Sequence, residues 1–436
     1  MWEDGVVFDP LHGRIQIPDW LIELKDTPAV RRMSNIRQLG LKALTGFPGA
    51  IHTRYMHCLG VMHLADKISK RLLNKEKLGV CRVPVYKTLD RNREVLKAAG
   101  FFHDVGHGPF SHALDFVIQK GLEKTHEEIA VDVVNMHEEA FQDQGINHNQ
   151  VAELIMGKEK IPFLRRIIDG PLDVDKADYL SRDCYHIGIR YGFDTDHLFD
   201  QIVITGSGTD LKECHLGLRD TDQARTVSEF FLLMWRSLYS LVYFDPVTRI
   251  AEKMLEKSAL LAVEENTDAK EYLTEFDKFL NLDESKLLAM LDSGDGESKL
   301  LTNKVLSNDL YKTIVILNLK DNKTSADFAE RTTKEYRDGL MDQMSQTLSK
   351  ESDHKYAVIC DIIEERIPKE IYLDKKDSKE LVPLRRYSPV VRVMMDKNEA
   401  NVRVFVYVMP ELVESSRYSQ DTLKKEAMEF IESYSI

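Results

Sequence analysis

The stretch 101-FFHDVGHGPFSHALD-115 places three histidines and two aspartates within fifteen residues. It begins at the end of an apolar run, 93–102, whose pattern predicts a buried helix. Two glycines and a proline then end this helix, and Ser111 is the expected N-cap of the next one. A solvated helix face needs no such density of imidazoles and carboxylates. The stretch therefore predicts a helical fold with a chemical site at the break between two helices.

The composition is that of an ordinary globular protein. Of the 436 residues, 43% are hydrophobic and 30% are charged, which is enough for a sizeable core. The net charge of −13 argues against a general binder of nucleic acids. No apolar run is long enough to span a bilayer, the first residues do not resemble a signal peptide, and the five cysteines are scattered. We therefore expect a cytoplasmic protein with no membrane partner.

Apolar residues at helical spacing predict a mainly α (α+β) fold. We expect helices, some of them interrupted, over 18–45, 53–73, 93–104, 111–122, 126–143, 149–157, 174–186, 224–244 and most of 247–319. Two short apolar runs within 201–218 predict a β-hairpin.

The pattern changes near residue 355, where apolar and polar residues begin to alternate. Strands are expected in YAVICDIIEERI (356–367), in VVRVMM (390–395) and in the valine-rich run 402–408, with a final helix over 419–433. The polar stretch 320–327 is a candidate linker. The expected units are therefore 1–260, a helical extension over 261–325, and a mixed α/β region over 326–436.

The adjacent pair His103–Asp104 is a candidate for binding a metal ion. Neighbours on a helix point about 100° apart, so both can reach one ion only at a helix end. His57 is a suitable upstream partner, and DVDKADYLSRD (173–183) supplies several carboxylates downstream. A shell of imidazoles and carboxylates suits Mn²⁺, Fe²⁺, Co²⁺ or Zn²⁺ better than Ca²⁺. In the alternative interpretation, the pair caps a helix and His57 fills a gap in the core.

Several ordered motifs resemble a known family. HTRYMHCLGVMHLA, FFHDVGHGPFSHALD, THEE and DVDKADYLSRDCYHIG are similar to motifs of the HD-domain superfamily of phosphohydrolases, in particular its deoxynucleoside triphosphate triphosphohydrolase branch. The resemblance covers about residues 5–260 and includes no counterpart of the sterile-alpha-motif domain that some members carry. It implies a helical HD core and a divalent metal (Mn, Fe, Mg, Zn or Co). The ligands implied are His57, His103, Asp104 and Asp175.

The resemblance also implies a reaction, cleavage of a deoxynucleoside triphosphate at its α-phosphorus into deoxynucleoside and inorganic triphosphate. The departing 5′-oxygen then needs an acid. His112 and Asp115 lie three residues apart and share a helix face, so the carboxylate is expected to orient the imidazole and raise its pKa. The matching family pair protonates the leaving group, while His107 and His126 match positions near the phosphates. Alternatively, His112 is a polar cap facing solvent.

Six further residues match substrate-binding positions of the family. The resemblance assigns phosphate contacts to Arg54 and Lys176. It assigns sugar contacts to Gln38, Tyr179, Asp183 and Tyr243. The alternative for the two tyrosines is ordinary packing in the core.

The chain departs from the family at two places. Trp235 replaces an arginine that contacts the terminal phosphate, and Arg236 and Arg249 are candidate substitutes. Asp26 is kept, but Gly5, Arg31 and Ser34 replace residues that contact an activating nucleotide in the family. The resemblance therefore leaves the activator open.

The expected function is metal-dependent dNTP hydrolysis, possibly dGTP-selective and nucleotide-regulated, in a homo-oligomer (dimer or tetramer). Two alternatives stay open. One is another HD-type nucleotide phosphohydrolase, such as a phosphatase, a (p)ppGpp-type hydrolase or a nuclease. The other is a nucleotide-sensing oligomeric scaffold without turnover.

Overall fold

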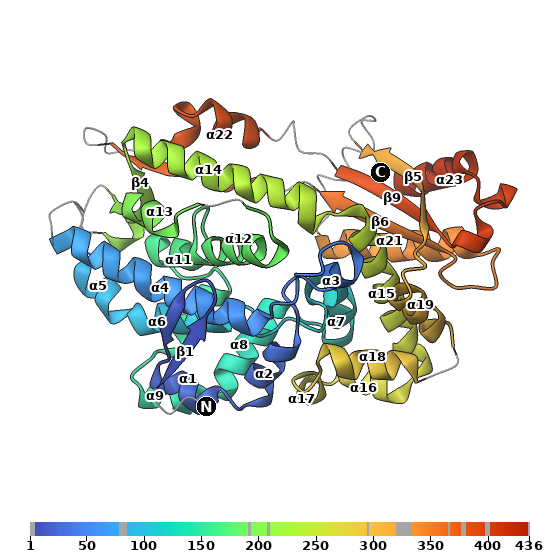
Figure 1. Ribbon diagram of the computed structural model, residues 1–436, viewed down its shortest axis with the longest axis horizontal. Helices are drawn as coiled ribbons and strands as arrows, with labels where there is room; N and C mark the ends of the chain where they lie inside the picture. Colours follow the sequence, from blue (N-terminus) through green and yellow to red (C-terminus); the bar gives the residue numbers. More distant parts are fainter. Residues whose placement is uncertain are drawn as a thin grey trace.

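The computed structural model describes residues 5–77, 85–190, 193–206, 210–293, 296–319, 334–364, 367–375, 381–396 and 402–434. Most of them lie in helices, which confirms the mainly α fold with small sheets. Figure 1 shows a large helical lobe, blue to green, beside a smaller part that contains the orange and red strands. The candidate linker 320–327 lies outside the described residues. Among the described helices, none has the length and hydropathy that crossing a membrane requires.

The helical lobe is built around one amphipathic helix, α4 (Arg54–Lys77). Its predicted apolar face is buried, with Val61, Leu64 and Ile68 fully inaccessible. α4 packs against α6 (Arg93–Phe102) and α12 (Val174–Ile187). Gly60 allows the close approach of α12, because a Cβ atom there would lie 1.9 Å from an oxygen of Asp178. The three helices that carry the predicted metal ligands therefore share one core.

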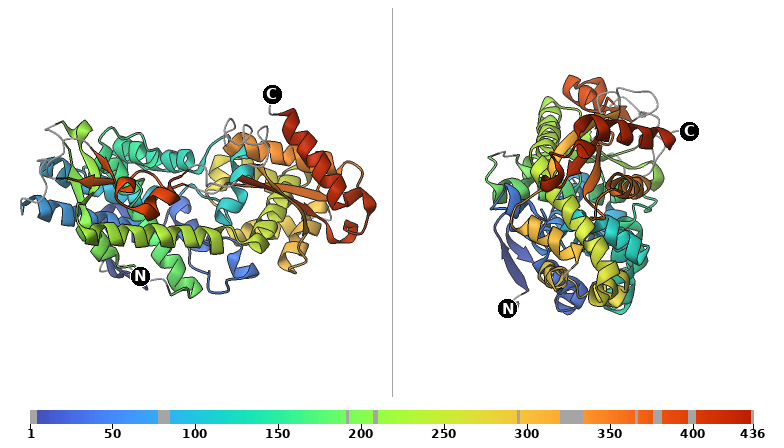
Figure 2. Two further views of the ribbon diagram at one scale, coloured as in Figure 1. Left: turned by 90° about the horizontal axis from the view of Figure 1, so that it is seen from above. Right: turned by 90° about the vertical axis from the view of Figure 1, so that its right-hand side faces the viewer.

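The remaining helices up to residue 306 are mostly short, apart from the two long helices α14 and α15, and α16 to α19 lie below the C-terminal strands in Figure 1. Before α12 they are α1 (Asp19–Leu24), α2 (Pro28–Arg31), η1 (Arg32–Asn35), α3 (Lys42–Thr45), α5 (Tyr86–Arg91), η2 (Ser111–Leu114), α7 (Asp115–Leu122), α8 (His126–Met136), α9 (Glu138–Asp143), α10 (His148–Ile155) and α11 (Pro162–Ile168). After α12 come α13 (Thr195–Gln201), η3 (Leu211–Glu213), α14 (Asp222–Leu238), a π-helical turn η4 (Tyr239–Tyr243), α15 (Pro246–Glu265), α16 (Thr267–Thr274), α17 (Phe276–Phe279), α18 (Glu284–Asp292) and α19 (Glu297–Leu306). Seen from above, α14 runs along the long axis of the molecule (Figure 2).

Two small sheets belong to the helical lobe. β1 (Val6–Asp9) and β2 (Gly13–Gln16) form an antiparallel hairpin. β3 (Ile202–Thr205) pairs antiparallel with β4 (His215–Arg219), which confirms the predicted hairpin. β7 (Tyr372–Asp374) joins β4 in parallel, and β8 (Val382–Pro383) completes this sheet. The chain therefore returns from its C-terminal region to the helical lobe.

A second hydrophobic core lies in the C-terminal region. Its sheet has the order β5 (Lys312–Asn318), β9 (Val402–Val408), β6 (Val358–Glu364), and α21 (Lys334–Ser349) and α23 (Gln420–Ser433) pack on it (Figure 1). The four valines of β9 are all buried.

Two predictions for this region are wrong. Residues 312–318 continue as a strand rather than a helix, because β9 pairs with them along their length. Residues 389–394 form a helix, α22 (Pro389–Met394), rather than a strand. Ser388 accepts a hydrogen bond from the Val391 amide (3.0 Å), and Pro389 occupies the first helical position, where its fixed φ favours a helix start. The unit boundaries at residues 260 and 325 stay predictions.

Candidate metal centre and active-site cavity

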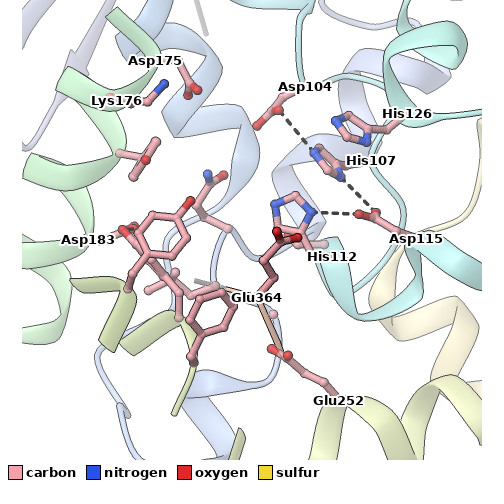
Figure 3. Close-up of a pocket in the computed structure, with 18 of the residues that line it drawn as sticks. Asp104, His107, His112, Asp115, His126, Asp175, Lys176, Asp183, Glu252 and Glu364 are labelled. Carbon is pink, nitrogen blue, oxygen red and sulfur yellow. Dashed lines mark hydrogen bonds and ion pairs between the residues drawn. The ribbon is translucent and has the colours of Figure 1, made fainter. Parts of the chain in front are cut away.

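A cavity of about 650 Å³ lies between the helical lobe and the C-terminal region. Figure 3 shows acidic and imidazole side chains converging on it from several elements. The cavity is lined by thirteen of the fourteen predicted site residues, namely Gln38, Arg54, His103, Asp104, His107, His112, Asp115, His126, Asp175, Lys176, Tyr179, Asp183 and Tyr243. His57, the fourteenth, is 1% exposed.

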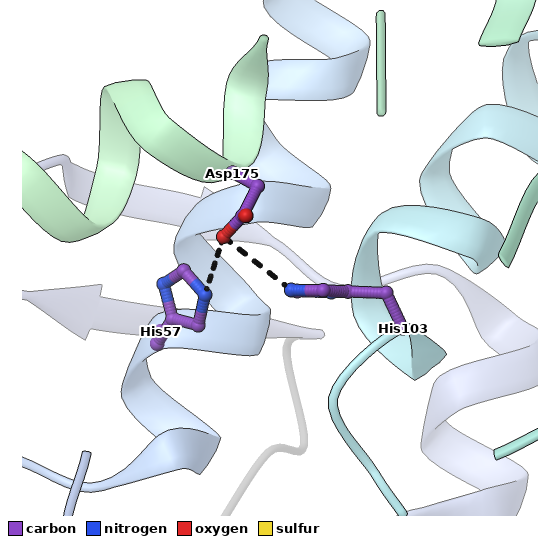
Figure 4. A group of neighbouring side chains, drawn as sticks. All are labelled: His57, His103 and Asp175. Atoms are coloured by element: carbon purple, nitrogen blue, oxygen red, sulfur yellow. Dashed lines mark ion pairs between the residues drawn. The ribbon is translucent and has the colours of Figure 1, made fainter. Parts of the chain in front are cut away.

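Three predicted metal ligands converge, as Figure 4 shows. Asp175 Oδ1 lies 3.1 Å from His57 Nε2 and 3.5 Å from His103 Nε2. These residues come from α12, α4 and the end of α6, so the packing of three helices brings them together. The three ligand atoms lie within 4.8 Å of one another, a spacing that one ion could bridge. The expected juxtaposition of distant residues is therefore present.

Both imidazoles have the orientation that a metal ligand needs, because each Nδ1 faces an acceptor. His57 Nδ1 contacts an oxygen of Asp178 at 2.8 Å, and His103 Nδ1 contacts the Gly100 carbonyl oxygen at 2.9 Å. An Nδ1–H that donates to each acceptor leaves the Nε2 lone pair facing Asp175. Both Nε2 atoms are buried and face the carboxylates of Asp175 and Asp104. Buried imidazole nitrogens that face carboxylates at this range fit a divalent cation.

The charge at this point is also that of a cation site. Burial lowers the pKa of His57, but the carboxylates of Asp175 and Asp178 outweigh it and raise the pKa to about 10. The two imidazoles in turn hold the pKa of Asp175 below its usual value against the effect of burial. The carboxylates therefore attract positive charge to the space between the imidazoles, which a metal ion would supply.

Asp104 lies at the edge of this group. Its Oδ1 is 3.4 Å from His103 Nε2 and its Oδ2 is 3.6 Å from His57 Nε2. Arg54, which is 2% exposed, donates to Asp104 Oδ2 and, at 2.9 Å, to the Ser111 hydroxyl. Asp104 thus connects the metal ligands to a phosphate-binding candidate.

The acidic residues of α12 are separated by helical periodicity. Asp175 faces the imidazoles, and Asp178, one turn later, lies behind His57. Asp173 is instead the N-cap of α12 and accepts from the Lys176 amide at 2.7 Å. Asp183, further along the same helix, also lines the cavity. The sequence offered four carboxylates, and the fold gives each a different role.

A network behind His57 was missed by sequence reasoning. Arg182 donates to both oxygens of Asp178 at 2.8 and 3.0 Å, and to Asp9 at 2.7 Å. His12 Nε2 lies 2.5 Å from Asp178. The i,i+4 spacing of Asp178 and Arg182 could have revealed their pair, whereas no local pattern points to the β1–β2 hairpin.

A second cluster lies beside the metal ligands. His112 Nδ1 is 2.9 Å from Asp115 Oδ2, and His107 Nδ1 is 3.5 Å from Asp115 Oδ1 (Figure 3). The ring of His126 stacks on that of His107, with centroids 3.8 Å apart. Because 60% of the His112 side chain is exposed, its ring is open to a ligand in the cavity.

Asp115 raises the pKa of His112, as expected, but the net shift is downward. Desolvation by the surrounding protein lowers this pKa, Asp115 raises it, and the balance leaves it at about 3. The charges of His107 and Arg54 lower it further. His112 is therefore neutral in the free protein at pH 7, with Asp115 orienting its ring.

The turn before this cluster has an unusual backbone. Phe110 and Ser111 both have positive φ values, 58° and 56°, which side-chain-bearing residues rarely adopt. Ser111 is not the predicted N-cap, because Phe110 precedes η2 and no side chain caps it. The Ser111 hydroxyl instead donates to the Arg37 carbonyl oxygen at 2.6 Å and accepts from Arg54. The strained turn thus fixes Arg54 beside the imidazoles.

Another group of cavity residues suits a sugar. Tyr243 donates a hydrogen bond of 2.6 Å to Asp183 Oδ2, and His52 Nε2 lies 2.7 Å from Asp183 Oδ1. Gln38 Oε1 is buried without a hydrogen-bond partner among the described residues. His52 was not predicted, and its position next to Arg54 and His57 gave no signal of this contact.

The residue at the departure from the family pattern also lines the cavity. Trp235 is 4% exposed, and its Nε1 has no hydrogen-bond partner in the described part of the chain. Arg249 lines the cavity too, but Asp361 accepts from its Nε and Nη2 at 3.1 and 2.6 Å. This pair engages Arg249 and weakens it as a substitute for the family arginine.

The fold and the site define a class, a mainly helical protein with a His/Asp cluster that could hold a metal ion at a break between helices. Residues 54–183 match the family model of the HD domain, and residues 225–426 match that of the HD associated region. The chain therefore belongs to the HD-domain superfamily.

Curated proteins extend this likeness. The deoxynucleoside triphosphate triphosphohydrolase SAMHD1 homolog of Dictyostelium discoideum is 27% identical over 357 residues, 77% of this chain and 65% of that protein. The human deoxynucleoside triphosphate triphosphohydrolase SAMHD1 is 29% identical over 293 residues, 59% of this chain and 44% of that protein. An uncharacterized Bacillus subtilis protein is 33% identical over 264 residues, 58% and 55% of the two chains. This chain thus spans less than two thirds of the length of these relatives.

A solved structure has the same fold. A hypothetical protein from Aquifex aeolicus superposes with a TM-score of 0.69 over 97% of this chain and 99% of its own. The two sequences are 23% identical, so the likeness concerns the fold alone.

Proposed function

We propose that this protein is a metal-dependent phosphohydrolase that cleaves deoxynucleoside triphosphates into deoxynucleoside and inorganic triphosphate. The observation that carries the proposal is the convergence of the buried Nε2 atoms of His57 and His103 on Asp175, in a cavity that basic side chains also line. A divalent metal ion bound there would polarise a phosphoryl group and lower the pKa of a coordinated water. The names of the Dictyostelium and human relatives support the substrate class.

Two basic side chains flank the proposed metal position. Arg54 lies beside Asp104 and is held by Ser111, while Lys176 directly follows Asp175 on α12. Lys176 Nζ donates to Asp173 at 2.6 Å and to the Gly170 carbonyl oxygen at 3.1 Å. Both cations are thus oriented before a ligand arrives, which favours binding of a polyphosphate in one register.

His112 is the proposed acid for the departing 5′-oxygen. Asp115 holds its Nδ1, so Nε2 is the atom that would deliver the proton. The ring is neutral in the free protein, and the negative charge of a bound polyphosphate would raise its pKa. Protonation of His112 would therefore accompany substrate binding. His107 and His126 would contact the same phosphates.

Four cavity residues, Gln38, Tyr179, Asp183 and Tyr243, would bind the sugar. Asp183 and Gln38 can hold a 3′-hydroxyl, since Gln38 Oε1 lacks a partner among the described residues. Tyr179 and Tyr243, whose ring centroids are 6.0 Å apart, would pack against the deoxyribose. A bulky ring where a 2′-hydroxyl would project disfavours ribonucleotides.

The test separates this function from its alternatives. The purified protein is incubated with Mn²⁺ or Mg²⁺ and single or mixed nucleotides, and the products are resolved by ion-exchange chromatography. Deoxynucleoside plus triphosphate supports the proposal. Monophosphate or stepwise phosphate release supports another nucleotide phosphohydrolase. Nucleotide binding without product in every mixture supports a sensing scaffold.

Regulation and assembly follow as parts of the same proposal. If a nucleotide activates the enzyme, a mixture that contains it will be hydrolysed faster than any single dNTP, and the same comparison reveals a preference for dGTP. Light scattering after gel filtration, with and without nucleotides, will show a dimer or tetramer if the protein is a homo-oligomer.

A further inference from the structure

The wall of the cavity carries several lysine and arginine side chains, each paired with a carboxylate. Six of these side chains are between 2% and 21% exposed, namely Lys42, Arg54, Lys176, Arg249, Lys253 and Arg337. Lys369 differs, because its side chain is 55% exposed and that of its partner Asp169 is 50% exposed. Among the described lining residues, this is the basic side chain most accessible to a ligand.

The difference in exposure decides which basic side chain can exchange its carboxylate partner for a ligand. An ion pair between two half-exposed side chains contributes little, because water solvates both partners once they separate. Opening a buried pair such as Arg249–Asp361 leaves a buried charge without a partner, which is strongly unfavourable. An incoming polyanion therefore displaces Asp169 from Lys369 more easily than it displaces any of the buried carboxylates.

The location of Lys369 follows from its partner. Asp169 immediately precedes Gly170, and the Gly170 carbonyl oxygen accepts a hydrogen bond from Lys176 Nζ at 3.1 Å. Lys176 in turn follows the metal-ligand candidate Asp175. A chain of phosphates that begins near Asp175 and passes Lys176 is therefore directed toward Lys369.

The backbone around Lys369 is held against the helical lobe. Arg166 donates to the Glu370 carbonyl oxygen at 3.3 Å, and the Leu384 amide donates to the Ile371 carbonyl oxygen at 2.8 Å. β7 then begins at Tyr372 and pairs with β4. The amine of Lys369 can therefore change partner while its main chain stays in place.

We propose that Lys369 binds the terminal phosphate of a nucleoside triphosphate and leaves Asp169 to do so. This assignment rests on the proposed function for the identity of the ligand. Lys369 thereby supplies a phosphate contact from the C-terminal region, in a cavity where Trp235 provides no charge. A ligand with three phosphates reaches this lysine, whereas a single phosphate at the metal end does not.

The test measures binding apart from turnover. Inorganic triphosphate and inorganic monophosphate are titrated calorimetrically into the full-length, Mn²⁺-loaded wild type and into Lys369→Ala, Lys369→Arg and Lys369→Glu. Lys425→Ala is the matched control, since Lys425 pairs with Glu429 on the surface of α23 and its side chain is 76% exposed. We expect Lys369→Ala to weaken triphosphate binding about ten-fold, Lys369→Glu to weaken it further, and Lys369→Arg to restore most of it.

Binding of monophosphate should stay within about two-fold of wild type in all variants, because its contacts lie at the metal end. The proposal is overturned if wild type does not bind triphosphate, if Lys369→Ala binds it like wild type, or if Lys425→Ala or monophosphate shows the same loss. Parallel assays of dNTP hydrolysis separate this assignment from the proposed function. If Lys369→Ala weakens triphosphate binding but wild type does not hydrolyse dNTPs, the phosphate site is retained and the proposed reaction is rejected. If wild type hydrolyses dNTPs but Lys369→Ala binds triphosphate unchanged, the reaction is retained and the phosphate site is rejected.

Discussion

Replacement of Asp178 by asparagine tests whether the carboxylate that contacts His57 Nδ1 supports metal binding at the proposed site. Asp178 is fully buried and accepts hydrogen bonds from Arg182, while His57 Nδ1 lies 2.8 Å from its Oδ2. Asn has almost the same shape but no negative charge. Its side-chain NH₂ group is a donor, and it would face another donor where the Asp178 oxygens accept hydrogen bonds. The carboxylate orients the ring of His57 and increases the basicity of its Nε2. Asp178→Asn should therefore weaken metal binding without removing a ligand.

The size of the effect follows from what such supporting contacts contribute. Loss of a carboxylate behind a metal-binding imidazole lowers metal affinity about 10- to 100-fold, which corresponds to about 1.4 to 2.7 kcal/mol. The assay is a competition titration of Mn²⁺ or Zn²⁺ against a fluorescent chelator at pH 7. The thermal unfolding midpoint of the metal-free protein is measured in parallel.

Asp9→Asn is the matched control. Asp9 accepts from the same Arg182, at 2.7 Å, and is also buried, yet no contact links it to His57. It should lower the unfolding midpoint while the metal affinity stays within about three-fold of wild type. An unchanged metal affinity in Asp178→Asn, or an equal loss in Asp9→Asn, would refute the view that Asp178 positions the ligand.

Three other predictions concern different parts of the molecule. His103→Ala should lose bound metal and activity together, and stoichiometric metal in the variant, measured by mass spectrometry, would reject His103 as a ligand. His112→Ala should keep the metal but slow turnover about 10²- to 10⁴-fold, so full activity would exclude its role as the acid. Burial raises the pKa of Glu256, but Lys253 and Lys257, at 2.7 and 2.9 Å, lower it to about 2. The stability from this carboxylate is present above its unfolded pKa of 4.5 and is lost as the pH falls toward 2. In urea titrations, wild type should thus lose up to about 3 kcal/mol more than Glu256→Gln between pH 6 and pH 2, and parallel curves would contradict the assignment.

Sequence periodicity predicted the helical lobe well because its helices bury one face. The spacing of Val61, Leu64 and Ile68 specifies the inner side of α4 whatever packs there. The metal-ligand candidates were singled out because an adjacent His103 and Asp104 are unusual in a solvated helix. The convergence of His57, His103 and Asp175 was therefore expected from a short stretch and its matching motifs.

The errors occurred where distant segments decide the structure. Residues 312–318 become a strand because β9, about ninety residues later, pairs with them, and no local pattern records this partner. The pKa of His112 depends mainly on desolvation by the surrounding protein. The three-residue spacing between His112 and Asp115 gives no information about that desolvation. Ser111 looked like a cap, but its hydroxyl is used by Arg37 and Arg54 from another part of the chain.

The support behind His57 has a consequence for biosynthesis. The β1–β2 hairpin is synthesised before α12, and its contacts with Asp178 and Arg182 span 166 and 173 residues of sequence. A nascent chain that ends before α12 cannot form these contacts, and its His57 also lacks the Asp178 carboxylate that orients the ring. Metal capture at full affinity should accordingly be a late event of maturation, completed only after α12 has been synthesised and has packed against the hairpin.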